Sequence, residues 1–240
     1  MMVSDLKKRA AEEFTHLLLA SEVREEIVKI ILFGSVLRGE AKEESDIDLL
    51  VIASGNLDKV RDASAESSFQ TWLKFHQGVE PLVYCVDSMR FHSSGFLKQV
   101  FQKGKEIFSM GEDERLKKEA KDYLSLAEQY LESAKRNLSE KDFRAAIDLA
   151  YNSSELCAKA LILLKGADIP GSHGGVVNKF GELYVVSGEI PKDLGRALNR
   201  TLELRNRARY DPHAEITPEG SKEVIELAKR ILKFLDDKLK

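Results

Sequence analysis

The spacing of apolar residues changes near residue 110, and this change restricts the fold more than any other feature of the sequence. Before it, helical spacing alternates with short β-branched runs that are typical of buried strands. After it, helical spacing continues, interrupted by Gly and Pro breakers. The expected elements are helices at 5–20 and 57–77, strands at 27–33, 46–52 and 79–86, and then helices near 113–138, 141–165, 175–187, 191–210 and 218–238.

This order predicts an α+β chain with two domains. A mixed-sheet α/β domain is expected over residues 1–110, and an all-α helical bundle over residues 111–240. The 240 residues suffice for two domains of ordinary size. The junction is expected at Gly111, in a polar segment.

The composition excludes several classes of protein. The formal net charge is −3 and both halves are nearly balanced, so the chain is not a polycation that binds any nucleic acid. No apolar run reaches the roughly 18 to 20 residues that cross a membrane. We therefore expect a cytoplasmic protein without membrane contact. Cys85 and Cys157 lack metal-ligand spacing, and we expect buried free thiols.

Two acidic residues, Asp46 and Asp48, stand at the start of the second expected strand. Because side chains alternate along a strand, both acids project from one face, about 6.5 to 7 Å apart along the backbone. Ile47 and Leu49 then point into a core. Two neighbouring acids without a counterion are costly. Mg²⁺ binds one or two carboxylates together with water and phosphate oxygens, so the pair favours a metal-bound nucleoside triphosphate.

A turn at Gly34 and Ser35 follows the first expected strand. Glycine allows the backbone to approach a phosphate closely, Ser35 offers a hydroxyl, and the amides of the next turn point at the anion. Arg38 is placed to pair with the same phosphates. Alone, the Gly-Ser pair also fits an ordinary strand-to-helix turn, and Asp46 also fits a solvated strand end. Their combination favours the nucleotide site.

The Gly34-Ser35 pair, ten further residues and then an Asp-Ile-Asp strand resemble the DNA polymerase β-type nucleotidyltransferase superfamily. The similarity is greatest to its minimal branch, which is related to kanamycin nucleotidyltransferase and to the MntA antitoxins, and it covers residues 27–52. It implies that Asp46 and Asp48 bind two Mg²⁺ ions on a nucleoside triphosphate, with ATP as the expected nucleotide. The residues expected to line the nucleotide site are Gly34, Ser35, Arg38 and Ser45.

The same resemblance implies a third carboxylate on a later strand. Glu80 stands at the matching place, as a catalytic residue and metal ligand, and Asp87 at the strand's end is the alternative. The family more usually has Asp there, and Pro81 follows directly. The implied reaction is attack of an acceptor hydroxyl on the α-phosphorus with departure of pyrophosphate. The acceptor stays open: a small molecule, a protein tyrosine or an RNA end.

The helical half resembles the HEPN domain, which commonly accompanies minimal nucleotidyltransferases. The resemblance implies a homodimer and, for the members that are ribonucleases, an RNA partner. Their motif is Arg, a polar residue, four to six residues and His. Arg205, Asn206 and His213 fit this count, but alignment with close toxin relatives puts Tyr210 at the histidine's place. The residues that resemble HEPN are Ala145-Ala146, Ala150-Tyr151, Ala158, Ala160-Leu161, Gly166, His173-Gly174, Arg205-Asn206, Ala208 and Tyr210.

Three functions are therefore hypotheses. The first is a Mg²⁺-dependent transfer of a nucleoside monophosphate to a hydroxyl, with the helical half providing acceptor binding or dimerisation. The second is a toxin–antitoxin fusion with a HEPN ribonuclease, and the third is a non-catalytic nucleotide-binding scaffold. The intact Asp pair favours the first, and the position of His213 disfavours the second. Arg200, Arg205 and Arg209 either form an anion-binding strip or pair with Glu203 and other acids.

Overall fold

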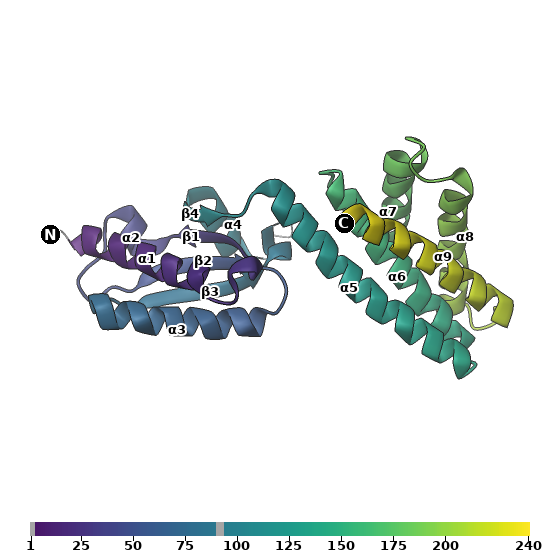
Figure 1. The fold of residues 1–240 in the computed structure, drawn as a ribbon, viewed down its shortest axis with the longest axis horizontal. Helices are drawn as coiled ribbons and strands as arrows, with labels where there is room; N and C mark the ends of the chain where they lie inside the picture. Colours follow the sequence, from purple (N-terminus) through teal and green to yellow (C-terminus); the bar gives the residue numbers. More distant parts are fainter. Residues whose placement is uncertain (1–2, 90–93) are drawn as a thin grey trace. The chain divides into compact units, whose positions relative to one another are not determined.

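The computed structural model describes residues 3–89 and 94–240 and separates into two compact units, Met1–Arg115 and Leu116–Lys240 (Figure 1). The first unit contains a mixed sheet and the second is helical, which confirms the α+β prediction. Among the described helices, none combines the length and the apolar character needed to cross a bilayer.

The first unit is a four-stranded sheet with helices on both faces. Its strand order is β3-β2-β1-β4, in which β1 is antiparallel to β2 and β4, and β2 is parallel to β3. A parallel pair needs a crossover connection, which α3 supplies. The starts of β2 and β3 therefore lie at the same edge of the sheet. The elements are α1 (Val3–Ala20), η1 (Arg24–Glu26), β1 (Ile27–Leu32), α2 (Gly34–Arg38), β2 (Ile47–Ala53), α3 (Leu57–Phe75), β3 (Val79–Cys85), η2 (Val86–Met89), α4 (Gly95–Lys103) and β4 (Lys105–Ser109).

Side chains of β2 alternate between two apolar cores. Ile47, Leu49 and Val51 pack with α1 and α3 on one face of the sheet. Leu50 and Ile52 pack with α4 on the other face. This alternation follows from the two-residue period of a strand. It confirms that the neighbours of the acid pair point into a core.

Helix α4 and strand β4 are absent from the sequence-based prediction. Helix α4 has nine residues, capped by Ser94, whose Oγ accepts a hydrogen bond from the N–H of Leu97 at 3.3 Å. Strand β4 is a five-residue edge strand without a buried residue. Both are too short to show a clear period. Strand β2 begins at Ile47, one residue later than predicted. Cys157 is buried and Cys85 half-buried, and neither forms a disulfide.

The helices that follow the sheet match the five predicted ones. Helix α6 is central, because it packs against α7, α8 and α9. Helix α7 begins at His173, two residues before the predicted start, and its predicted last turns form a π-helical segment, Gly181–Val185. The bounds are α5 (Glu112–Ser139), α6 (Phe143–Leu164), α7 (His173–Phe180), α8 (Lys192–Tyr210) and α9 (Pro218–Leu239).

The end of α8 is held by a side chain from α6. Arg144 donates hydrogen bonds from Nη1 to the carbonyl oxygens of Ala208 at 2.7 Å and Asp211 at 3.0 Å. Its Nη2 donates to those of Pro212 at 3.4 Å and Ala214 at 2.9 Å. The last carbonyls of a helix have no partner within the helix and form the negative end of its dipole. A cation placed there therefore stabilises α8 and the turn after it.

Replacing Arg144 by alanine leaves these carbonyl oxygens without their donor. Because hydrogen bonds to a charged group each contribute about 1.5 to 3 kcal/mol and several of these are partly exposed, we expect the free energy of unfolding to fall by about 2 kcal/mol. Urea unfolding measures the change. Arg207→Ala, at an exposed arginine of the same helix end, is the matched control and should change it by less than about 0.5 kcal/mol. Equal losses in both variants would contradict the capping role.

Candidate active site

Asp48 is held at the start of β2, beside the turn that follows β1. The N–H of Phe33 donates to the carbonyl oxygen of Asp48 at 3.1 Å, and the N–H of Ser35 donates to the Asp48 carboxylate. Gly34 lies between them with a φ of +73°, and a Cβ atom at this position would overlap the carboxylate. Glycine is therefore required both for the backbone conformation and for space.

Glu80 stands next to Asp48 on the neighbouring strand. The parallel register pairs Ile47 with Val79 and Asp48 with Glu80. Paired residues on adjacent strands point to the same face of the sheet. Asp87 comes after the end of β3, so it lies at the opposite end of that strand. The structure therefore brings Glu80, and not Asp87, beside Asp48.

Asp46 precedes β2 and is exposed. A Cβ atom at Gly78 would overlap the Oδ1 atom of Asp46, so this carboxylate lies against the residue that precedes β3. The N–H of Ile47 also donates to the carbonyl oxygen of Gly78 at 2.9 Å. The three acids thus gather at one end of the parallel strand pair.

A buried lysine that the sequence-based prediction lacks supports the loop before Asp46. Lys7 of α1 has no exposed surface, and its Nζ donates to the carbonyl oxygens of Glu43 at 3.0 Å and Ser45 at 2.6 Å and to Oε1 of Gln77 at 2.5 Å. An ammonium group has three N–H donors, and each finds an acceptor here. Burial lowers the pKa of Lys7, while the charge of Asp46 opposes this. Its place on the apolar face of the first predicted helix is the signal that points to it.

The other predicted nucleotide-site residues differ in their surroundings. The Oγ atom of Ser45 accepts the N–H of Lys42 at 2.9 Å, so this hydroxyl shapes the loop before β2. Arg38 ends α2 and pairs with Glu40 at 2.7 Å, and both side chains are exposed. The charge of Arg38 also acts on Asp48.

The acids repel one another. Burial, followed by the negative charges of Glu80 and Asp46, raises the pKa of Asp48 above its usual range. The N–H of Ser35 and the charge of Arg38 act in the opposite direction without balancing it. An added cation would relieve this repulsion.

The donor set fits an ion that arrives with a nucleotide. Within residues 3–89 and 94–240, no three His, Cys, Asp or Glu side chains are gathered closely enough to form a ready metal site. Mg²⁺ needs only one or two carboxylates when water and phosphate oxygens complete its shell. Asp46 and Asp48 meet that requirement.

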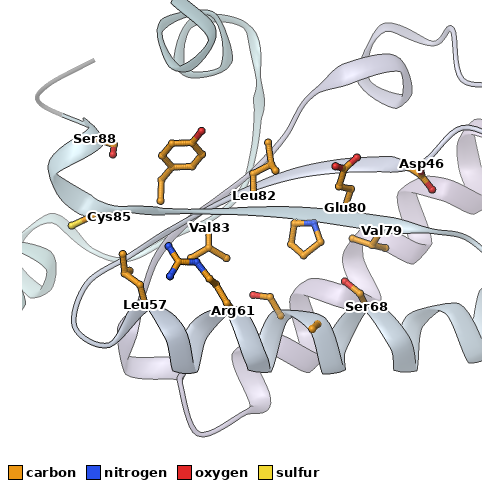
Figure 2. A pocket seen from close by; sticks show the side chains of 14 residues that line it. Asp46, Leu57, Arg61, Ser68, Val79, Glu80, Leu82, Val83, Cys85 and Ser88 are labelled. Atoms are coloured by element: carbon orange, nitrogen blue, oxygen red, sulfur yellow. The ribbon is translucent and has the colours of Figure 1, made fainter. Parts of the chain in front are cut away.

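A groove with a volume of about 1020 Å³ runs along β3 and α3, and Asp46 and Glu80 line one end of it (Figure 2). Figure 2 shows Arg61 rising from α3 toward Val83 of the strand, while the Glu80 side chain points to the other side of β3. Strand β3 is an edge strand, so the groove is open along its length. Of the three acids, Asp46 and Glu80 therefore border this end of the groove.

A second cavity, of about 550 Å³, lies beside the glycine turn. Gly34, Arg38 and Lys103 line it, and its lining in the described part of the chain includes no acidic residue. Phe33 and Phe96 also line it, with ring centres 5.4 Å apart in an edge-to-face arrangement. This cavity is therefore basic and aromatic, unlike the acidic end of the groove.

In the helical unit, the predicted motif residues lie in different settings. Arg205 is buried, and its Nε donates to Oδ1 of Asp148 at 3.0 Å while Nη1 donates to Oδ1 of Asn206 at 3.2 Å. The exposed ring of Tyr210 has its centre 5.7 Å from Cζ of Arg205. His213 lies after the end of α8, in an exposed turn. Three of the four residues are thus neighbours on the last turns of α8.

Three arginines of α8, Arg200, Arg205 and Arg209, are paired with acids of neighbouring helices. Arg209 contacts Asp148 of α6 at 3.3 Å, and Arg200 pairs with Glu223 of α9. The expected pairing with acids is therefore present, although the partners are on other helices and not Glu203. These arginines do not form a strip of unpaired cations.

A buried carboxylate lies elsewhere on α6. Glu155 accepts Nζ of Lys159 at 2.7 Å and contacts Nδ1 of His173, at the start of α7. Burial acts to raise the pKa of Glu155, but the hydrogen bonds and charges of Lys159 and His173 outweigh it, so the pKa lies below its usual range. The sequence relates His173 only to the HEPN family. Its contact with Glu155 ties the start of α7 to α6.

Gly34 and Gly39 provide a matched pair for testing the packing of the site. Both have positive φ, +73° and +76°, but only at Gly34 would a Cβ atom meet another side chain. We expect Gly39→Ala to lower the free energy of unfolding by about 1 kcal/mol, the cost of the left-handed conformation. Gly34→Ala should lower it by at least about 1 kcal/mol more, because Asp48 must move. Similar losses in urea unfolding would show that Gly34 does not pack against Asp48.

Each unit matches a known protein family. The family described as Polymerase beta, Nucleotidyltransferase matches residues 18–113, and the HEPN domain family matches residues 120–238. A candidate toxin of Methanocaldococcus jannaschii is 34% identical over 95 residues, which are 40% of this chain and 70% of that protein. A candidate protein adenylyltransferase of the same organism is 46% identical over 56 residues, which are 23% of this chain and 55% of that protein.

A solved structure also aligns with the chain. It is a nucleotidyltransferase-like protein from Exiguobacterium sibiricum, which covers 93% of this chain and 75% of its own length at 12% identity. Its TM-score of 0.37 is too low to support an inference. The family matches are sufficient: the chain belongs to the polymerase β-type nucleotidyltransferases through its first unit and to the HEPN family through its second.

Proposed function

We propose that the first unit transfers a nucleoside monophosphate, AMP from ATP, to an acceptor hydroxyl in a Mg²⁺-dependent reaction. The observation that carries this proposal is the gathering of Asp46, Asp48 and Glu80 between a basic cavity and an open groove. Membership of the nucleotidyltransferase family supports the reaction class. The name of one relative, a candidate protein adenylyltransferase, supports AMP as the transferred group.

The basic cavity suits the triphosphate. Arg38 and Lys103 line it without a competing acid in its described lining, so it favours a polyanion. Gly34 and the N–H groups of the following turn allow phosphate oxygens to approach the backbone closely. Phe33 and Phe96 offer aromatic surface on which a base can stack.

The three acids have different roles in the proposed reaction. Asp46 and Asp48 would hold Mg²⁺ together with the triphosphate, and the metal would supply positive charge to the phosphates and to the departing pyrophosphate. Glu80, on the neighbouring strand, accepts the proton of the acceptor hydroxyl. As that oxygen bonds to the α-phosphorus, the bond between the α-phosphorus and the bridging oxygen of pyrophosphate breaks in line.

The groove along β3 and α3 is the proposed acceptor site. It reaches Asp46 and Glu80 and is open to solvent along the edge strand. Arg61 gives it one positive charge. Small molecules, polypeptides and RNA ends remain the three classes of acceptor, and we propose that the HEPN unit contributes acceptor binding and a contact between two copies of the chain.

A ribonuclease activity of the HEPN unit is the second candidate, favoured by the relatives whose names describe candidate toxins. RNA cleavage needs a group with a pKa near neutrality beside the scissile phosphate. The burial of Arg205 against Asp148 and the position of His213 beyond α8 disfavour such a site within one copy. Loss of RNA cleavage on His213→Ala would promote this candidate.

Label transfer tests the proposed reaction directly. Purified protein is incubated with Mg²⁺, each of the four nucleoside triphosphates labelled at the α-phosphate, and acceptors of the three classes. We expect ATP to label one class, and Asp48→Asn to reduce transfer by at least about 10²-fold, because preorganised electrostatic stabilisation is lost. Glu22→Gln, at an exposed acid between α1 and η1 that lines neither cavity, is the control and should retain activity. Equal transfer by the wild type and Asp48→Asn would refute the proposal.

Kinetics of two single variants test which ligand occupies which cavity. Lys103→Ala should raise KM for ATP about 10-fold, since one charge-assisted contact contributes about 1.5 kcal/mol or more. Arg61→Ala should leave KM for ATP unchanged and alter KM for the acceptor. If Arg61→Ala alone weakens ATP binding, the assignment of the two cavities is reversed.

A further inference from the structure

Helix α3 buries its small side chains and exposes its large apolar ones. The buried positions include Val60, Ser64, Ser67 and Thr71, and the last two donate their hydroxyls to carbonyl oxygens one turn earlier on the same helix. The exposed side chains Phe69, Trp72 and Leu73 have relative exposures of 53%, 48% and 49%. A helix that covers a sheet normally shows the reverse arrangement. Another surface is therefore expected to cover this face.

The exposed face is one stripe along the helix, here called the α3 stripe. Its members from Asp62 to Leu73 recur at helical spacing. His76, the left-handed residue that ends the helix, continues the stripe through its ring contact with Trp72. The acidic residues of the stripe come before Phe69. Its imidazole comes after Trp72, in edge-to-face contact with that ring at 5.8 Å between centres. The α3 stripe comprises Asp62, Ala65, Glu66, Phe69, Trp72, Leu73 and His76.

We infer that the α3 stripe binds the α3 stripe of a second copy of this chain, with the two helices antiparallel and Phe69 on the two-fold axis. In that arrangement, positions equally far from residue 69 face each other. Asp62 lies seven positions before Phe69, and His76 lies seven positions after it. Asp62 of one copy therefore meets His76 of the other twice, once at each end of the contact.

The intervening positions fit the same arrangement. Ala65 faces Leu73, so a small side chain meets a large one and the helices can approach closely. Glu66 faces Trp72. The indole ring has an N–H donor and no acceptor atom, so it can donate to the Glu66 carboxylate. A parallel arrangement would instead place Asp62 beside Asp62 and Glu66 beside Glu66. Like charges then oppose association, and only the antiparallel pairing is complementary.

The pattern of residues on the α3 stripe favours a second copy of the chain as its binding partner. A two-fold contact uses the same patch on both chains, so that patch must be complementary to itself. The acidic first half and the aromatic, imidazole-bearing second half of the α3 stripe meet this condition. Three half-exposed apolar side chains bury less than the roughly 800 Å² per partner of a standard interface, so the contact is weak unless another contact holds the copies together.

Site-specific cross-linking in the full chain tests the contact and its register. Half-buried Cys85 is replaced by serine, and buried Cys157 is retained. Phe69→Cys is expected to form cross-linked dimers with a short bis-maleimide. Gln70→Cys is also exposed but points to a different side of α3, so it is the matched control and should form few.

Two further variants fix the direction of the helices. Asp62→Cys and His76→Cys should each fail to cross-link alone, because the identical positions would lie fourteen residues, roughly 21 Å, apart. A mixture of the two should give the mixed dimer. Circular dichroism of each variant confirms the fold before cross-linking. If Phe69→Cys cross-links no better than Gln70→Cys, or the mixture no better than the single variants, the antiparallel self-contact is wrong.

Discussion

The first unit has to hold three carboxylates close together against their electrostatic repulsion, and this constraint governs its structure. Asp48 and Glu80 are paired across two parallel strands, and Asp46 lies at the start of the same pair. A parallel pair aligns the starts of its strands, so the crossover through α3 is what brings the acids together. The fold maintains this concentration of like charge through rigid supports: a glycine that yields space to a carboxylate, and two cores that fix the strand from both faces.

Short-range patterns in the sequence were enough to predict part of this site. The two-residue period of a strand predicts that Asp46 and Asp48 project from one face and Ile47 from the other. The structure confirms that Ile47 is in the core. The place of Glu80 came from resemblance to a family, and the register shows it beside Asp48. Lys7 was missed because its three acceptors lie 36 to 70 residues away, where no periodic pattern can report them.

The same reason explains the fold elements that could and could not be predicted. Long amphipathic helices and apolar strands were found, because each shows several repeats of its period. Helix α4 and strand β4 are short, and each shows too few repeats of its period to be recognised. In the helical unit, counting along the sequence related Arg205 to His213, whereas in space Arg205 is paired with Asp148, 57 residues earlier. Family membership therefore defines the HEPN scaffold, and the chemistry of its surface depends on contacts that the motif does not contain.

The ammonium group of Lys7 joins three parts of the chain that are made at different times. Its own helix leaves a ribosome before the loop at residues 43 to 45, and Gln77 comes last of the three. Until Gln77 is available, the buried cation lacks one of its three acceptors, and β3 is not yet present to pair with β2. The organised acid cluster therefore needs all three parts, and a nascent chain that stops before β3 has the Asp-Ile-Asp sequence without Gln77 and Glu80.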